Sequence, residues 1–439
     1  MNTLNNITGA LSVLMIFVFG VYLSFKTKFF QFLGLKNAFK TLIKDLFSHK
    51  NSTNGVSSKG AMCTALAATI GTGNIVGVSG AIALCGAGVV FWLVVSSAFA
   101  MIIKYTEIYI AVYFKKSMQN GFVGGTMYAV KYGLPKRFLP LGVCFSALLL
   151  LASLGTGNLI QINTSLSGLL NIFPKNFKFS LEVSVCFSLI TAVFIGFLLL
   201  SGIDSVAKTC EKTIPFLLLF YTASSLAVIL LNFDRLPQVL AMILEGAFTP
   251  KAVTGGAVTS LFLTLKTGIV RGIVSNEAGM GSATVAHAVS NNKNPKTEGE
   301  LGIAEVFIDT AVCLLTALVI LLGNKEITYG TDTGLLLALS GFENTFGAIS
   351  KYILAIFLML FGISSVLGWG AYGTVAAEFL YGKTGGLVYK FLFSAACVLC
   401  PLISVDKIWS FSEILNSIMS IPNVIAVFLL FKGFKNITK

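Results

Sequence analysis

Apolar residues follow one another in long runs along this chain, and short polar stretches separate the runs. A helix needs about 20 mostly apolar residues to cross a lipid bilayer. The pattern therefore predicts an all-α integral membrane protein with about eleven transmembrane helices. These helices are expected at residues 9–32, 60–84, 88–115, 138–171, 180–201, 204–231, 255–290, 298–323, 344–380, 386–404 and 407–432.

The predicted helices after 9–32 divide into two sets of five, at 60–231 and 255–432. Each set opens with a helix that glycines interrupt: GTGNIVG at 71–77 and TGIVRGIVSNEAGMGS at 267–282. Because five is odd, the second set enters the membrane in the opposite direction, and the sequence predicts an inverted repeat with one extra N-terminal helix. Corresponding Gly-interrupted helices are the best sequence indication of a transporter's binding site.

The first interruption offers backbone groups that could bind ions. Glycines at 71 and 73 weaken the helix and release backbone groups from their usual partners. The released N–H groups, together with the N-terminus of a half-helix, could bind a carboxylate, and the released C=O groups could bind a cation. The alternative is that the glycines only allow two helices to pack closely.

Polar side chains in two later helices are further candidates. The tetrapeptide GTGN recurs at 155–158 and is followed by Gln161. Its amide could hold either charged group of an amino acid, or it could simply bind a neighbouring helix. In the second half, Ser365 and Trp369 are four residues apart and share one helix face. Both residues could serve a ligand or could be part of ordinary packing.

Composition agrees with lipid as the surrounding solvent. Hydrophobic residues make up 55% of the 439 residues and charged residues only 11%, whereas soluble domains carry about 25% charged residues. We expect a single transmembrane domain over residues 1–439. The net charge of +13 does not indicate nucleic-acid binding, because the chain has no basic run with interleaved aromatic residues.

Lysine and arginine residues gather on one side of the predicted bundle. The loops at 26–59 and 115–137 and the tail at 432–439 hold 15 of the 31 lysine and arginine residues, and all three fall on one side if the number of helices is odd. Cytoplasmic loops carry such an excess. We therefore predict a multi-pass protein of the cell membrane, with its N-terminus outside and its C-terminus in the cytoplasm.

Among the charged residues inside the predicted helices, seven are candidates for positions in the interior of the bundle. Each costs about 2.5–3.5 kcal/mol at the centre of a bilayer and should therefore face the interior and have a partner. Structural ion pairing is the default interpretation: Lys104 and Glu107 are spaced to pair within one helix, and Arg271 and Glu277 could hold a gate closed at the second interruption. The seven residues are Lys104, Glu107, Lys266, Arg271, Glu277, Asp309 and Glu378.

Enzymatic chemistry is not expected. Cys397 and Cys400 form a C-x-x-C motif inside an apolar run, without a second pair or a nearby histidine, and packing explains them. The chain's two histidines, His49 and His287, cannot supply a histidine-based metal site. We find no nucleophile–base pair in the sequence.

Four blocks of sequence resemble the alanine or glycine:cation symporter family, and they follow in order along nearly the whole chain. The family is similar in fold to the five-plus-five neurotransmitter:sodium symporters (the LeuT-like fold of the APC superfamily), with one extra N-terminal helix. The resemblance implies uptake of small neutral amino acids, alanine or glycine, driven by Na⁺ or sometimes by protons. The blocks are GTGNIVG, GTGNLIQIN at 155–163, RGIVSNEAGMGSATVAHA at 271–288 and VFIDT at 306–310.

The resemblance also implies which residues bind substrate and ion. The implied substrate residues are Thr72, Gly73, Asn74, Gln161, Thr267, Gly268, Ser365 and Trp369. The implied sodium ligands are main-chain oxygens of Ala67, Ile70 and Phe361 and the hydroxyls of Ser364 and Ser365. The chain departs from the family's pattern at Ala371, where a bulkier and more polar residue is usual, and at Thr126, where proline is usual.

Na⁺ is expected as the coupling ion, with no other cofactor. Proton coupling is the alternative, with Asp309 or Glu107 as the carrier. A cation channel is disfavoured because the sequence has no carbonyl filter and no ring of acidic residues. The substrate's side chain is expected to face Trp369, which leaves little room beyond a methyl group. Glycine and alanine should therefore compete for uptake, and leucine, phenylalanine, glutamate and lysine should not.

Overall fold

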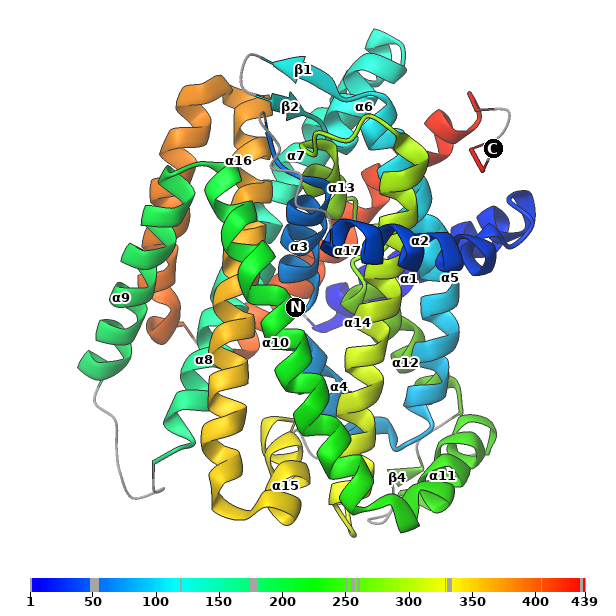
Figure 1. Cartoon of the computed structure of the whole chain (residues 1–439), viewed down its shortest axis with the longest axis vertical. Coiled ribbons are helices and arrows are strands. Elements are labelled where there is room, and N and C mark those ends of the chain that lie inside the picture. The colour runs from blue at the N-terminus through cyan, green and yellow to red at the C-terminus, as the bar shows by residue number, and fades with distance from the viewer. Residues whose placement is uncertain are drawn as a thin grey trace.

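The computed structural model describes residues 2–47, 55–118, 121–173, 181–249, 252–253, 257–258, 261–327, 329, 334–403, 405–434 and 437–438. Most of these residues are helical, and the helices form one bundle (Figure 1). The predicted fold class, an all-α membrane protein, is confirmed.

The number of passes agrees with the prediction. Within the described ranges, nine stretches of helix are long and apolar enough to cross a membrane. One of these stretches, 334–402, turns back at Gly382, where φ is 72°, and makes two passes (Figure 1). Two shorter helices, α12 (Leu261–Ser275) and α13 (Ala283–Ala288), follow each other across the bundle and make one more. Together these are the eleven predicted passes.

The helices follow the same order in the two halves of the bundle. A broken helix comes first, then a long unbroken helix, a short helix at one end, and three further passes. The first half has α3 (Ser58–Thr69) with α4 (Gly73–Cys85), α5 (Val89–Tyr113), α6 (Thr126–Gly133), α7 (Leu139–Leu154) continued by the π-helical turn η2 (Gly155–Leu159) and α8 (Ile160–Leu170), then α9 (Leu181–Leu200) and α10 (Ile203–Leu231). The second half has α12 with α13, α14 (Pro295–Gly323), α15 (Gly334–Phe346), the two arms of α16 (Ser350–Leu399) and α17 (Val405–Phe431). α6 and α15 lie at opposite ends of the bundle (Figure 1), which is the arrangement of an inverted repeat.

Short elements that the apolar runs did not predict connect the passes. Two antiparallel pairs of strands occur, β1 (Lys116–Met118) with β2 (Gly121–Val123) and β3 (Ala252–Val253) with β4 (Ala257–Val258). α11 (Leu236–Phe248) lies at the same end of the bundle as α15 (Figure 1). The 3₁₀ turns are η1 (Lys136–Phe138), η3 (Phe233–Arg235), η4 (Gly347–Ile349) and η5 (Cys400–Leu402).

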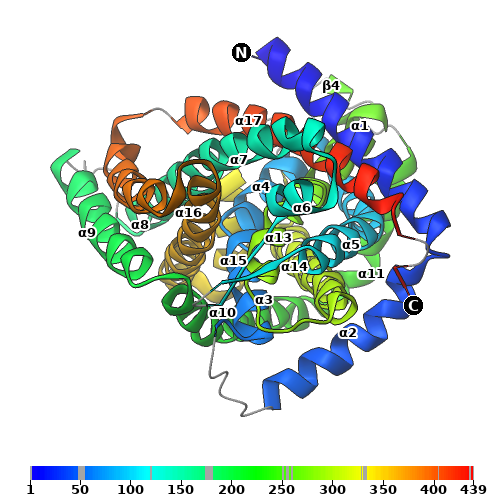
Figure 2. The same cartoon turned by 90° about the horizontal axis from the view of Figure 1, so that it is seen from above.

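The N-terminal helix ends earlier than expected. α1 (Asn2–Lys26) stops before Lys28 and Phe29, which both have φ of 55°, and α2 (Phe30–Phe47) then leaves in a new direction (Figure 2). The apolar run to residue 32 therefore covers two helices instead of one. α1 lies on the outside of the bundle against α17, and α2 packs on α14 (Figure 2).

Candidate functional site

A cavity of about 360 Å³ lies where the two broken helices approach each other. Its walls come from both breaks, from η2 and α8, and from α16, α17 and α1. Five of the predicted substrate residues lie in the wall: Gly73, Asn74, Gln161, Thr267 and Trp369. Thr72 is buried between the wall residues Gly71 and Gly73 and does not itself line the cavity. Gly268 and Ser365 lie elsewhere.

At the first break, α3 ends at Thr69 and α4 begins at Gly73. The amide oxygen of Gln161 accepts hydrogen bonds from the backbone N–H of Thr72 at 3.1 Å and from its hydroxyl at 3.0 Å. A Cβ atom at Gly71 would lie 2.8 Å from this oxygen, and only glycine therefore permits the contact. At Gly73 the same position meets open space. A substrate carboxylate at Thr72 would have to replace Gln161.

Trp369 forms a wall of the cavity because η2 has a glycine, Gly157, where it packs against the tryptophan. A Cβ atom at Gly157 would lie 2.1 Å from Trp369 Cβ, and the π-helical turn therefore needs glycine at this point. Trp369 is fully buried and packs edge-on against Tyr372. Its indole Nε1 has no hydrogen-bond partner among the described residues.

The residues of the predicted sodium site come together beside the first break. Ala67, Ile70 and Phe361 are all buried. The hydroxyl of Ser365 donates to the carbonyl of Ala68 at 3.1 Å, across the boundary between α16 and α3. The hydroxyl of Ser364 donates to the carbonyl of Phe361, in its own helix, at 3.0 Å. Oxygen atoms from the two helices therefore meet here.

Gly268 faces away from the cavity. A Cβ atom at this position would lie 2.5 Å from Trp92 Cβ and 2.7 Å from the carbonyl of Val89, both on α5. The glycine thus lets α12 pack closely on α5. Its neighbour Thr267 does line the cavity, and its hydroxyl accepts a hydrogen bond from the thiol of Cys85 at 3.4 Å.

Asp309, on α14, joins α4 and α12, which are one half of each broken helix. It is fully buried, and its carboxylate accepts hydrogen bonds from Asn74 Nδ2 on α4 at 2.5 Å and from the hydroxyl of Ser275 on α12 at 2.8 Å. Asn74 therefore lines the cavity with its amide already bound to Asp309. Within the described ranges, Asp309 is in no ion pair with a Lys, Arg or His.

The pairing predicted for Lys104 and Glu107 is wrong. Lys104 Nζ lies 2.9 Å from Glu305 Oε1 on α14, and Glu107 accepts a hydrogen bond from Asn423 on α17. Sequence spacing describes neighbours along one helix, but both side chains turn toward the helices that bury them. Glu277, expected beside Arg271 at a gate, accepts a hydrogen bond from the hydroxyl of Ser282.

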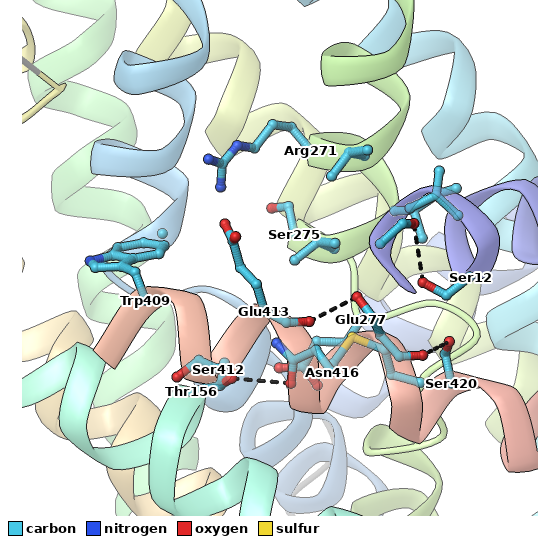
Figure 3. A pocket seen from close by; sticks show the side chains of 18 of the residues that line it. Ser12, Thr156, Arg271, Ser275, Glu277, Trp409, Ser412, Glu413, Asn416 and Ser420 are labelled. Atoms are coloured by element: carbon cyan, nitrogen blue, oxygen red, sulfur yellow. Dashed lines mark hydrogen bonds between the residues drawn. The ribbon is translucent and has the colours of Figure 1, made fainter. Parts of the chain in front are cut away.

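α17 contributes a wall of the cavity that the sequence pattern was not expected to provide. Figure 3 shows Ser412, Asn416 and Ser420 along this helix beside the cavity, and Asn416 accepts a hydrogen bond from the hydroxyl of Thr156 at 3.1 Å. Arg271, from α12, points toward Glu413 across the same space (Figure 3). The recurrence of polar residues every four positions in an apolar run was the available signal, because such residues share one helix face.

Comparisons with known proteins agree with this architecture. The profile of the sodium:alanine symporter family matches residues 1–439. The sodium/alanine symporter AgcS of Methanococcus maripaludis is 32% identical over 436 residues, which are 98% of this chain and 94% of that protein. The probable sodium/glutamine symporter GlnT of Bacillus subtilis is 33% identical over 424 residues, which are 96% of this chain and 86% of that protein.

Among solved structures, MhsT in complex with L-phenylalanine has a similar fold. Its TM-score is 0.65 at 13% sequence identity, and the match covers 88% of this chain and 91% of that one. At this identity the likeness concerns the fold alone, and it confirms the LeuT-like fold that the family resemblance implies. Because the family profile matches the whole sequence and the fold agrees with it, the chain belongs to the sodium:alanine symporter family.

Proposed function

We propose that this protein imports a small neutral amino acid, alanine or glycine, together with Na⁺ by alternating access. The observation that carries the proposal is the meeting of both broken helices at one cavity, with the hydroxyls of α16 against the end of α3 beside it. The names of the relatives AgcS and GlnT, a sodium/alanine and a probable sodium/glutamine symporter, support the same substrate class.

In this proposal the first break holds the substrate's carboxylate. The amides at Thr72 and Gly73 stand at the N-terminus of α4, where a helix favours negative charge. The carboxylate replaces the oxygen of Gln161 at Thr72, and the ammonium group binds near Thr267, which lies in the continuous part of α12. The side chain then faces Trp369.

Sodium binds, in this proposal, among the carbonyls of Ala67, Ile70 and Phe361 and the hydroxyls of Ser364 and Ser365. A hard cation prefers oxygen ligands of this kind. One cation that crosses 100 mV releases about 2.3 kcal/mol. A tenfold ion gradient adds about 1.4 kcal/mol, and the sum could sustain roughly 500-fold accumulation of substrate.

Uptake into proteoliposomes tests the proposal directly. Radiolabelled alanine is offered under a Na⁺ gradient without a pH gradient, and then under a pH gradient without Na⁺. We expect accumulation only in the first condition, and we expect unlabelled glycine to compete. Accumulation that follows the pH gradient and ignores Na⁺ would overturn the ion assignment.

Proton coupling is the second candidate, because Asp309 is a buried carboxylate between the two breaks. If the proton were the coupling ion, Asp309→Asn would abolish accumulation driven by a pH gradient while exchange of labelled for unlabelled alanine continued. If Na⁺ is the coupling ion, the same variant should keep its dependence on the Na⁺ gradient.

A further inference from the structure

Four charged side chains form a chain of contacts in the interior of the bundle. They are Lys104 on α5, His287 on α13, and Glu298 and Glu305 on α14, and all four are fully buried. Lys104 Nζ lies 2.9 Å from Glu305 Oε1. His287 Nε2 lies 3.3 Å from Glu305 Oε2, and His287 Nδ1 lies 2.9 Å from Glu298 Oε2. We call these four residues the buried charge cluster.

The buried charge cluster is balanced when each member carries its charge. An ionised carboxylate only accepts hydrogen bonds, and both ring nitrogens of His287 face carboxylate oxygens. The ring then donates from both nitrogens, which is the charged imidazolium. Two positive groups therefore face two negative groups. Removal of one member leaves a buried charge without its partner, which is strongly unfavourable.

The cluster touches both helix breaks. The hydroxyl of Thr69, the last residue of α3, donates to Glu305 Oε1 at 2.8 Å. Lys104 Nζ donates to the carbonyl of Asn276, the residue that follows α12, at 2.8 Å. One ion pair thus holds the chain at the edge of the first break and at the edge of the second.

The cluster also holds the far ends of α3 and α13. In the predicted orientation these two are the inner half-helices, on the cytoplasmic side, and α4 and α12 are the outer ones. Glu298 Oε1 accepts hydrogen bonds from the hydroxyl of Ser58, the first residue of α3, at 2.5 Å and from the hydroxyl of Ser290, just after α13, at 2.9 Å. The backbone joins the same ends, since Asn291 N donates to the carbonyl of Val56 at 2.8 Å. Figure 2 shows α3, α13, α14 and α5 side by side.

Two different carboxylates of α14 bind the inner and the outer half-helices. Asp309 binds the outer halves through Asn74 and Ser275, whereas Glu305 binds the inner halves through Thr69 and His287. Asp309 and Glu305 are four residues apart and share one face of α14. The inner contacts can therefore be lost while the outer contacts remain.

We propose that Lys104 and Glu305 are positioning residues, which set the two helix breaks against each other, and that the buried charge cluster keeps α3 and α13 closed on α14. Movement of α3 away from α14 requires the contacts of Glu305 and Glu298 to break together. The inference rests on the proposed function only in its use of alternating access, and it assigns the inner side of the pathway to these four residues.

Cys63 provides a built-in reporter of this movement, because it lies on α3 and is only 6% exposed. The full-length protein in proteoliposomes is treated with a maleimide, and the peptide that contains Cys63 is followed by mass spectrometry with and without Na⁺. In Glu305→Gln we expect labelling at least about tenfold faster than in the wild type, since Lys104 and His287 lose a buried partner. We also expect Na⁺ to lose its effect on the rate.

A matched control lies on the same helix. Lys59 of α3 pairs with Glu211 at 3.3 Å, with both side chains about 30% exposed. Glu211→Gln removes a partially exposed ion pair and should change the labelling rate by less than about twofold. A change as large as that of Glu305→Gln would show that any lost pair on α3 suffices, and it would overturn the special role of the cluster.

A second variant separates positioning from mere stability. Lys104→Met combined with Glu305→Gln removes both charges of the pair and leaves no unpaired lysine. We expect the yield of folded protein to recover while Cys63 still reacts fast. Labelling at the wild-type rate in this double variant, or in Glu305→Gln alone, would overturn the proposal. The measurement needs no transported substrate, and failure of alanine uptake would therefore refute the proposed function without affecting this test.

Discussion

Gly157→Ala is the substitution that most directly tests the role of Trp369 in the cavity wall. The new Cβ atom would lie 2.1 Å from Trp369 Cβ and 2.3 Å from its Cγ. Non-bonded carbons in a core are separated by about 3.5–4.0 Å. Because Cβ is fixed to the backbone, α16 and η2 must separate by more than about 1 Å, and the indole moves with α16. Overpacking of this kind costs about 1–3 kcal/mol. Tyr372 packs against the ring, which restricts where it can go.

The substrate's affinity should report this displacement. If about 1.4 kcal/mol of the strain is relieved by movement of Trp369 into the cavity, alanine binds about tenfold more weakly. We would measure the alanine concentration for half-maximal uptake into proteoliposomes, with the rate per folded protein as a second readout. Gly80→Ala is the control, since a Cβ atom there meets nothing within 4 Å. An unchanged half-maximal concentration in Gly157→Ala would refute the assignment of Trp369 to the substrate wall.

Three further predictions concern ion, substrate and orientation. Ser365→Ala and Ser364→Ala should both raise the Na⁺ concentration for half-maximal uptake. Ser365→Ala should have the larger effect, because the hydroxyl of Ser365 joins two helices. An unchanged Na⁺ dependence would contradict the sodium site. Trp369→Ala should admit valine and weaken alanine binding. In the wild type, the preference for alanine over glycine should be at most about 10–200-fold, and strong inhibition of uptake by leucine would contradict the small pocket. Cysteines introduced in the loops at 26–59 and 232–254 should be labelled from opposite sides of the membrane, the first from the cytoplasm.

The passes could be predicted from the sequence because a lipid bilayer leaves few alternatives to long apolar helices. The end of the first helix could not. Apolar residues continue after Lys28. The helix nevertheless stops where Lys28 and Phe29 take positive φ values. Apolar content alone does not distinguish a pass from a following helix with exposed lysines. α2 was missed for this reason, although Lys36 and Lys40 are spaced for one exposed face.

The breaks were predictable for a local reason, namely the glycines that weaken the helices. Which residues surround the cavity was less predictable, because it depends on how distant helices pack. Gly268 was expected at the second interruption, but it lies within the continuous helix α12 and permits the close contact with Trp92. Asn416 stands far from either interruption and yet lines the cavity. Lys104 likewise finds its partner, Glu305, about 200 residues along the chain, where spacing gives no signal.

The contacts at the first break suggest how binding could be coupled to movement. Thr72 donates its N–H and its hydroxyl to the neutral amide oxygen of Gln161. Hydrogen bonds to a carboxylate are about twice as strong as those to a neutral acceptor, and we therefore expect a bound amino acid to take over these donors. Thr72 is three residues from Thr69, whose hydroxyl Glu305 holds. A change at Thr72 thus reaches the buried charge cluster through two intervening residues, without any helix having to bend.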